Sequence, residues 1–310
     1  TTQSLKKNIN ELVVTCCNSA GYPQLIAKRT QSFLSQVINA LQFNCENPEA
    51  FLGETTDFRY HCSNGVLRYL PNENQWRLDP FSPEDYSRDR AEVTYDPNAT
   101  CPNFMKFLDS GLDSDCIELM QLYFGQVLIG RNLSQTMLLL SGKAGTGKST
   151  VVTMLEKLIG LPKSAELRLE HLGGRFETSQ LMGKSLLTAK DVSEDYLRSK
   201  HAFRLKEITG SDQMKAELKF QNKSIAFRGQ FNLIITSNAL LRIKLESDRD
   251  AWKRRILLIE YTKERPEMIF NLEEILTREL SGILNWAMEG VKKLFAMNCH
   301  IKLSEALEKR

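Results

Sequence analysis

The sequence predicts an α/β fold: a parallel β-sheet core, preceded by a mixed helical region and followed by a helical tail. Four short apolar runs, separated by polar or helical segments, have the pattern of buried strands in a parallel sheet. They are residues 136–141, 185–189, 231–237 and 256–261. The first run leads directly into a glycine-rich loop and then into an apolar-periodic segment, the order of a strand–loop–helix unit.

The composition is that of a folded globular protein. Apolar residues make up 42% and charged residues 25% of the 310 residues, which excludes a disordered tail or a fibre. The longest apolar runs are far shorter than the ~20 residues that cross a bilayer, and the N-terminus lacks a signal-peptide pattern. We therefore expect a cytoplasmic protein. The seven cysteines have no metal-ligand spacing, so we expect them to be reduced and mostly structural.

Charge is distributed unevenly along the chain, although the net charge is only +3. Residues 72–118 contain eleven acidic and four basic side chains, whereas residues 196–230 contain eight basic and three acidic ones. The two stretches are either ordinary solvated faces, or the basic one contacts nucleic acid.

We divide the chain into three regions. Residues 1–130 form the mixed region: helical spacing over 5–43, interrupted at 21–23, a hairpin near 64–70, and a proline-rich connector over 80–102. An amphipathic helix over 116–128 leads to the predicted core, residues 131–265. Residues 266–310 are expected to be helical, because one apolar stripe runs from Leu280 to Leu294.

The strongest motif is Gly-Lys-Ala-Gly-Thr-Gly-Lys-Ser at residues 142–149, which matches the phosphate-binding loop G-x-x-x-x-G-K-[ST]. Its glycines let backbone N–H groups surround a phosphate, and the helix N-terminus adds positive potential. We expect Lys148 against the β- and γ-phosphates and the Ser149 hydroxyl on Mg²⁺. The predicted nucleotide-binding residues are Gly142, Ala144, Gly145, Thr146, Gly147, Lys148, Ser149 and Thr150.

Three further positions follow or precede the predicted strands. Asp191 follows the second strand and is the first candidate for holding the metal and polarising water, with or without Glu194; Asp is also common at caps and turns. Asn238 follows the third strand, where its amide either orients the attacking water or serves a turn. Arg254 and Arg255 precede the fourth strand, as an arginine finger for a neighbouring subunit or as a basic surface cluster.

The order of phosphate loop, acid, amide and arginine, each beside a strand, resembles superfamily 3 helicases of the AAA+ class. The helicase part of phage, plasmid and poxvirus primase-helicases is similar over about residues 60–297. In that family Glu is usual at the place of Asp191, and Asn at the place of Thr146. Four segments resemble family motifs: N-G-V-L at 64–67, Y-D-P-N-A-T-C-P at 95–102, K-E-I-T-G-S-D at 206–212 and E-L-S-G-I-L-N-W-A-M-E-G at 279–290.

The resemblance implies an AAA+ core, preceded at residues 1–130 by a collar-like region. It implies an ATP- and Mg²⁺-dependent DNA helicase of phage or plasmid replication, a homo-oligomeric, hexameric ring that moves 3′ to 5′ on single-stranded DNA in the host cytoplasm. The metal is assigned to Ser149 and Asp191. A primase or primase-polymerase domain is expected upstream, and the start at Thr1 suggests a fragment or processed product. Residues 213–223 take the place of a hairpin that grips DNA, with these candidate contacts: Lys215, Lys219, Phe220 and Lys223.

Several interpretations stay open on the sequence alone. Phe220 either stacks on a base or packs beneath the hairpin. The chain can also be an AAA+ ATPase that acts as a DNA-binding initiator or loader without processive unwinding. A small-molecule phosphotransferase would share only the phosphate loop and would leave Arg255 and the basic segment without a role.

Overall fold

The computed structural model describes residues 2–28, 30–45, 57–85, 87, 89–171, 177–217, 224–242, 249–263 and 269–308. The chain divides into two compact units, residues 1–54 and 55–310. In the first unit, α1 (Thr2–Ser19) and α2 (Gln31–Cys45) flank a 3-10 turn, η1 (Pro23–Lys28). The prediction of short helices with a break at 21–23 is thus confirmed. Ile9, Leu34 and Ile38 form the small buried core of this unit; the domain boundaries expected near 130 and 265 stay predictions.

The second unit is built on a five-stranded parallel sheet with the order β10-β4-β9-β6-β5. The α/β prediction is therefore confirmed, and all four predicted strands are present. The fifth, β5, was not predicted, because three residues are too few to show a periodicity. The strands are β4 (Met137–Gly142), β5 (Ser164–Glu166), β6 (Leu186–Val192), β9 (Asn232–Ser237) and β10 (Ile256–Tyr261).

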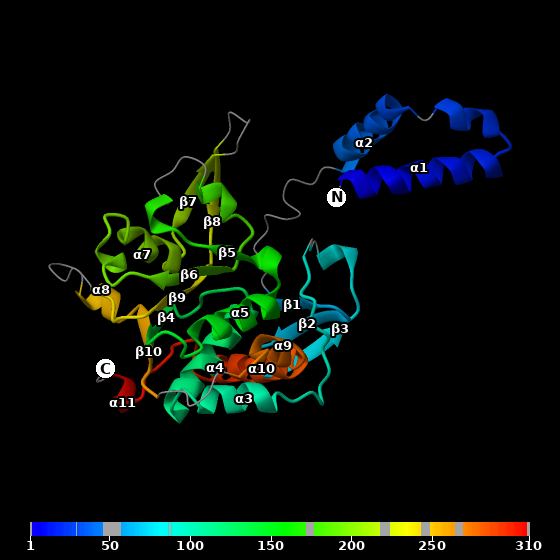
Figure 1. Ribbon diagram of the computed structural model, residues 1–310. Coiled ribbons are helices and arrows are strands. Elements are labelled where there is room, and N and C mark those ends of the chain that lie inside the picture. The colour runs from blue at the N-terminus through cyan, green and yellow to red at the C-terminus, as the bar shows by residue number, and fades with distance from the viewer. Residues whose placement is uncertain are drawn as a thin grey trace. The chain divides into compact units, whose positions relative to one another are not determined.

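Helices cover both faces of the sheet (Figure 1). Leu138 and Leu140 of β4 lie in one apolar cluster with side chains of α4 (Ser114–Leu128), α5 (Lys148–Ile159) and α10 (Leu280–Ala296). Met137 and Leu139 point to the opposite face and a second cluster, as the two-residue period of a strand requires. The second cluster contains side chains of α7 (Phe203–Thr209) and α8 (Arg249–Lys253).

Two glycines allow α4 and α10 to pack with their backbones almost in contact. A methyl group at Gly125 would come within 2.5 Å of the Val291 amide nitrogen. A methyl group at Gly290 would come within 2.1 Å of the Gln121 carbonyl oxygen. Both distances are far below van der Waals contact, so any larger residue would push the two helices apart.

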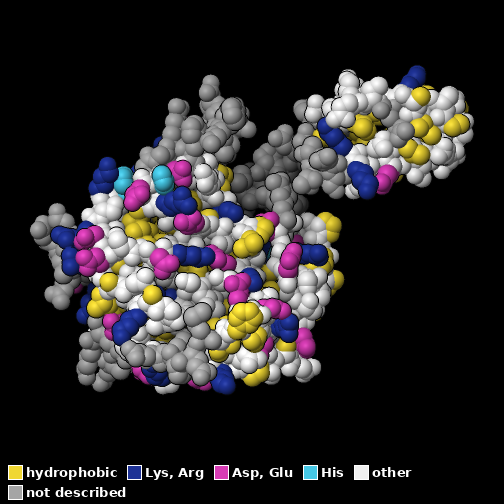
Figure 2. Space-filling model, in the orientation of Figure 1, with side chains coloured by type: hydrophobic (Ala, Val, Ile, Leu, Met, Phe, Trp, Pro, Cys, Tyr) yellow, Lys and Arg dark blue, Asp and Glu magenta, His cyan; other side chains and the backbone are white. Residues whose placement is uncertain are grey.

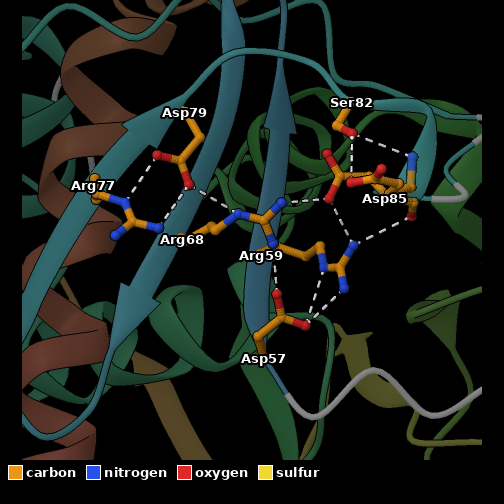
Figure 3. Close-up of polar contacts among 8 residues, drawn as sticks. Asp57, Arg59, Arg68, Arg77, Asp79, Ser82 and Asp85 are labelled. Atoms are coloured by element: carbon orange, nitrogen blue, oxygen red, sulfur yellow. Dashed lines mark hydrogen bonds and ion pairs between the residues drawn. The ribbon is translucent and has the colours of Figure 1, made fainter.

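The predicted hairpin is confirmed as the first two strands of a three-stranded antiparallel sheet: β1 (Phe58–Cys62), β2 (Gly65–Leu70) and β3 (Gln75–Asp79). Three arginines face each other across this sheet, because Arg59 pairs with Arg68 in the register and Arg68 pairs with Arg77. Like charges at such positions repel. Three carboxylates lie between them and neutralise the row (Figure 3): Asp57, Asp79 and Asp85.

Three of the motif segments interlock in the folded chain. The Asn64 side chain accepts a hydrogen bond from Tyr95 N and donates one to Tyr95 O, both 2.9 Å long. Asn285 Nδ2 donates to the carbonyls of Asp96 (2.8 Å) and Ala99 (2.9 Å). The Glu279 carboxylate accepts from two amides, at 3.1 and 2.9 Å, at the start of α3 (Pro102–Asp109), where negative charge stabilises a helix. These segments therefore hold the connector and α10 together.

The other elements are shorter. They are η2 (Pro83–Asp85), η3 (Leu161–Lys163), η4 (Leu169–His171), α6 (Glu177–Gln180), η5 (Tyr196–Arg198), β7 (Gln213–Glu217), β8 (Ser224–Arg228), α9 (Leu272–Thr277) and α11 (Glu305–Glu308). Among the residues that the structure describes, no helix is both long enough and apolar enough to cross a membrane. Figure 2 shows acidic and basic side chains interspersed on the visible face of the second unit.

Candidate nucleotide-binding site

The phosphate loop joins β4 to α5, as the sequence predicts. Gly142 lies against β10, where a methyl group would be 2.8 Å from Tyr261 Cβ. Gly145 and Gly147 have left-handed φ angles of 79° and 90°, which glycine adopts without strain. Thr146 Oγ1 donates to Lys143 O at 2.9 Å, a hydrogen bond within the loop.

Lys148 lies at the centre of the site and is 3% exposed. Its Nζ donates to the carbonyls of Gly142 (2.6 Å) and Lys143 (2.8 Å) and to Asn238 Oδ1 (3.2 Å). Burial lowers the pKa of Lys148, and the Asp191 carboxylate opposes this shift. The structure thus brings the predicted lysine, acid and amide together at the carboxyl edge of the sheet.

Asp191 lies on a β-bulge near the end of β6, between Ala189 and Val192. Its φ angle of 51° is left-handed, a conformation that Asp and Asn adopt more readily than most residues. Its backbone N–H donates to Thr236 Oγ1 of the neighbouring strand at 2.9 Å. Thr236 is not among the residues predicted from the sequence. Its place near the end of an apolar strand was the one sequence feature that pointed to a role in the site.

Asn238 follows β9, which lies between β4 and β6 in the sheet. Ser237 Oγ donates to Val192 O at 3.0 Å, which links the end of β9 to the end of β6. Further along the loop, Arg242 bonds to Glu194 through its backbone N–H (2.7 Å) and its guanidinium (3.1 Å). Glu194, expected as a possible assistant of Asp191, is therefore engaged in an ion pair.

The two arginines lie at the opposite edge of the sheet from the phosphate loop. In the parallel register Met137 pairs with Ile256 and Gly142 with Tyr261, so Arg255 precedes β10 at the amino edge. At about 3.3 Å per residue, the two edges are about 20 Å apart. Arg254 is exposed, whereas Arg255 is half-buried and its Nη1 donates to Ala251 O at 3.0 Å. Neither side chain can reach the phosphate loop of its own subunit.

A two-stranded hairpin follows α7, as the resemblance implies. β7 and β8 pair antiparallel, with Lys215 opposite Ala226 and Gln213 opposite Arg228. These four side chains lie on one exposed face, which adds Arg228 to the basic residues expected there. The remaining candidates lie outside the described residues: Lys219, Phe220 and Lys223.

The donor set of this site fits a nucleoside triphosphate with Mg²⁺. Left-handed glycines turn the loop before the N-terminus of α5, an arrangement that presents N–H groups to phosphate. The exposed hydroxyl of Ser149 and carboxylate of Asp191 are hard oxygen donors, which Mg²⁺ prefers. Ala144 is exposed and Thr150 half-buried on the same loop-to-helix segment. Among the described side chains, three cysteines are buried, and these are Cys62, Cys101 and Cys116.

Two family models match different parts of the chain. Residues 19–112 match "D5 N terminal like", and residues 140–255 match a family of unknown function, DUF5906. The second match extends from the end of β4 to Arg255 and so contains the predicted nucleotide site. The two matches lie on separate parts of the chain, and neither covers half of it.

The chain is also similar to particular proteins and structures. An uncharacterized mitochondrial protein of Marchantia polymorpha, ymf21, is 29% identical over 131 residues, which are 37% of this chain and 68% of that protein. An apo structure of the NrS-1 C-terminal region has a TM-score of 0.54 at 15% identity, over 81% of this chain and 70% of that chain. Another apo structure of that region has a TM-score of 0.51 at 15% identity, over 80% and 73%. At these identities the likeness concerns the fold.

Proposed function

We propose that the chain is the ATP-dependent motor part of a superfamily 3 DNA helicase of the AAA+ class. The observation that carries the proposal is the meeting of Lys148, Asn238 and Asp191 at the carboxyl edge of the sheet. In the sheet, β4 and β9 are neighbours. After β4 the chain continues to β5 at one edge of the sheet, and after β9 it continues to β10 at the other edge. Ligands of open α/β sheets bind at such switch points.

Each residue then has a defined task in hydrolysis. Backbone N–H groups of residues 143–149 and the Lys148 ammonium bind the β- and γ-phosphates. Ser149 and Asp191 would hold Mg²⁺, which would supply positive charge to the phosphate oxygens. The Asn238 amide orients the attacking water, and the Asp191 carboxylate accepts a proton from that water. Asp191 is one methylene shorter than the usual Glu, and its bulged backbone is the feature that positions it.

A subunit interface supplies the remaining positive charge in this proposal. Arg254 and Arg255 lie about 20 Å from their own phosphate loop, so they contribute to hydrolysis only in a neighbouring copy. A closed ring of head-to-tail interfaces provides such a neighbour for every site. We propose a hexamer, as in the family that the chain resembles. The exposure of Arg254 makes it the side chain better placed to leave its own subunit.

Single-stranded DNA is the proposed track, contacted by the basic face of the β7–β8 hairpin. This hairpin lies in the chain between β6, which carries Asp191, and β9, which leads to Asn238. A movement of the hairpin can therefore be transmitted along the chain to Asp191 on one side and to Asn238 on the other. We propose 3′-to-5′ movement, phage-type replication in a host cytoplasm, and an upstream primase or primase-polymerase. The mitochondrial relative makes an organelle the alternative compartment.

The test measures ATP turnover with and without single-stranded DNA, together with unwinding of a duplex that has a 3′ tail. Wild-type protein should hydrolyse ATP faster with DNA present. Lys148→Ala should lose turnover while keeping its fold, because its Nζ contacts loop groups rather than core. The matched control is Lys157→Ala, which removes a lysine of the same helix that pairs with Glu273. Equal turnover in Lys148→Ala would refute the motor; turnover indifferent to DNA would favour the initiator or loader.

A further inference from the structure

The loop that follows β9 is held to the loop that follows β6 at two places. The first is at the strand ends, where Asp191 N donates to Thr236 Oγ1 and Ser237 Oγ donates to Val192 O. The second is beyond Asn238, where Arg242 N donates to Glu194 O at 2.7 Å and Arg242 Nη2 lies 3.1 Å from Glu194 Oε2. Asn238 therefore lies in a short segment fixed at one end to β6, which carries Asp191, and at the other end to the loop that follows β6.

Burial does little to hold this segment in place. Asn238 and the two residues after it are exposed, with Leu240 57% exposed; Leu241 packs at the margin of the second apolar cluster. The Asn238 amide nevertheless lies within hydrogen-bond distance of Lys148 Nζ. Polar contacts beyond Asn238 are thus needed to keep its side chain directed at the lysine, and the Glu194–Arg242 ion pair supplies them.

We propose that Glu194 and Arg242 are positioning residues: their ion pair, defined here as the latch, sets Asn238 relative to Lys148 and Asp191 for nucleotide hydrolysis. This inference rests on the proposed function, which supplies the reaction, ATP hydrolysis. The latch lies outside the phosphate loop. Because both side chains are largely exposed, at 44% and 58%, their pair adds little to global stability, and its effect is local.

The first test is a charge-exchange experiment on ATP turnover. Glu194→Gln and Arg242→Gln should each lower kcat about tenfold, short of the roughly 100-fold that a misplacement of about 1 Å can cost. The KM for ATP should stay within about twofold, since Lys148 and the loop are untouched. The double variant Glu194→Arg/Arg242→Glu should recover most of kcat. Arg168→Gln is the control: it breaks the Glu166–Arg168 pair, 2.9 Å long and 57–64% exposed, and should leave kcat unchanged.

The second test is amide hydrogen exchange of the same proteins, which does not depend on turnover. Loss of either partner should speed exchange in residues 191–195 and 238–242, including the Arg242 amide, and leave the β4 amides protected. Wild-type exchange in both segments of the single variants would overturn the latch. So would a loss of kcat confined to Glu194 variants, or a double variant as slow as the singles. An inactive wild-type protein would refute the proposed function, while hydrogen exchange would still decide the latch.

Discussion

Lys148 is held by loop carbonyls and by Asn238 Oδ1, so its ammonium is fixed at the place where phosphate charge is expected. Burial would favour loss of its proton, and the nearby Asp191 carboxylate counteracts that tendency. The same carboxylate is thus part of the electrostatic setting of the lysine as well as the proposed metal ligand. The backbone of Asp191 is left-handed. A substitution that removes the charge but tolerates this backbone conformation can therefore test the charge alone.

Asp191→Asn tests the charge without disturbing the bulge. Asn adopts the left-handed conformation as readily as Asp, so the fold and nucleotide binding should be retained. Turnover of ATP should fall about 100-fold or more, as when a general base is removed. The measurements are circular dichroism, nucleotide affinity and steady-state hydrolysis. Asp195→Asn, which removes an exposed carboxylate paired with Arg198, is the control, and wild-type turnover in Asp191→Asn would exclude its proposed role.

At the scale of elements, the β7–β8 hairpin separates a buried from an exposed face with a two-residue period. Met214 and Ala216 are buried, whereas Lys215 and Arg228 are exposed. Sequence reasoning identified Lys215 but stopped at residue 223, because only the pairing of the two strands reveals that Arg228 shares its face. Cross-strand register is a tertiary property that the spacing of a single segment does not contain.

Lys215→Ala/Arg228→Ala should weaken binding of single-stranded DNA and flatten its salt dependence. Two lost phosphate contacts reduce the slope of log K against log salt by about 1.4. Because both side chains are exposed, the fold should be unaffected. Arg278→Ala/Lys302→Ala removes the same charge from exposed positions in the C-terminal helical region and serves as the control. Equal salt slopes for the two double variants, measured by fluorescence anisotropy, would exclude this face as the DNA contact.

The sheet itself was largely predictable, for a physical reason. Strands buried on both faces are continuous apolar runs, and such runs are visible in a single sequence. β5 was missed because it is a three-residue edge strand, and Thr236 was missed because its partner, the Asp191 amide, is 45 residues away in the chain. The motif segments at 64–67, 95–102 and 279–290 were recognised by resemblance. Only the structure reveals that they contact each other.

At the scale of the whole molecule, the sheet register separates Arg254 and Arg255 from the phosphate loop of the same subunit. Neither arginine therefore reaches a nucleotide bound at the phosphate loop of its own chain. In the proposed motor, hydrolysis is a property of pairs of subunits rather than of single chains. This requirement distinguishes a ring motor from an enzyme that works as a monomer.

Mixing inactive variants tests that requirement. Arg254→Ala/Arg255→Ala should bind ATP and lose turnover about 10³-fold, as when an arginine finger is removed. When it is co-assembled with Lys148→Ala, some interfaces pair an intact arginine with an intact lysine, so ATPase activity should return. Asp191→Asn mixed with Lys148→Ala is the control, because each of their nucleotide sites lacks one residue of its own and should stay inactive. Absence of recovery in the arginine mixture, with co-assembly shown by sizing, would contradict action across an interface.

The close packing of α10 on α4 also has a consequence for folding during translation. α10 packs on α4 and α5, and its Met288 carbonyl accepts a hydrogen bond from Trp76 Nε1 of β3. On a ribosome adding about 5–20 residues per second, the loop emerges on the order of ten seconds before α10. During that interval α4 can pack on α3 and α5 but lacks α10, whose Trp286 ring lies against Phe124. Nascent chains would therefore need chaperone protection until the helix that completes the core has been translated.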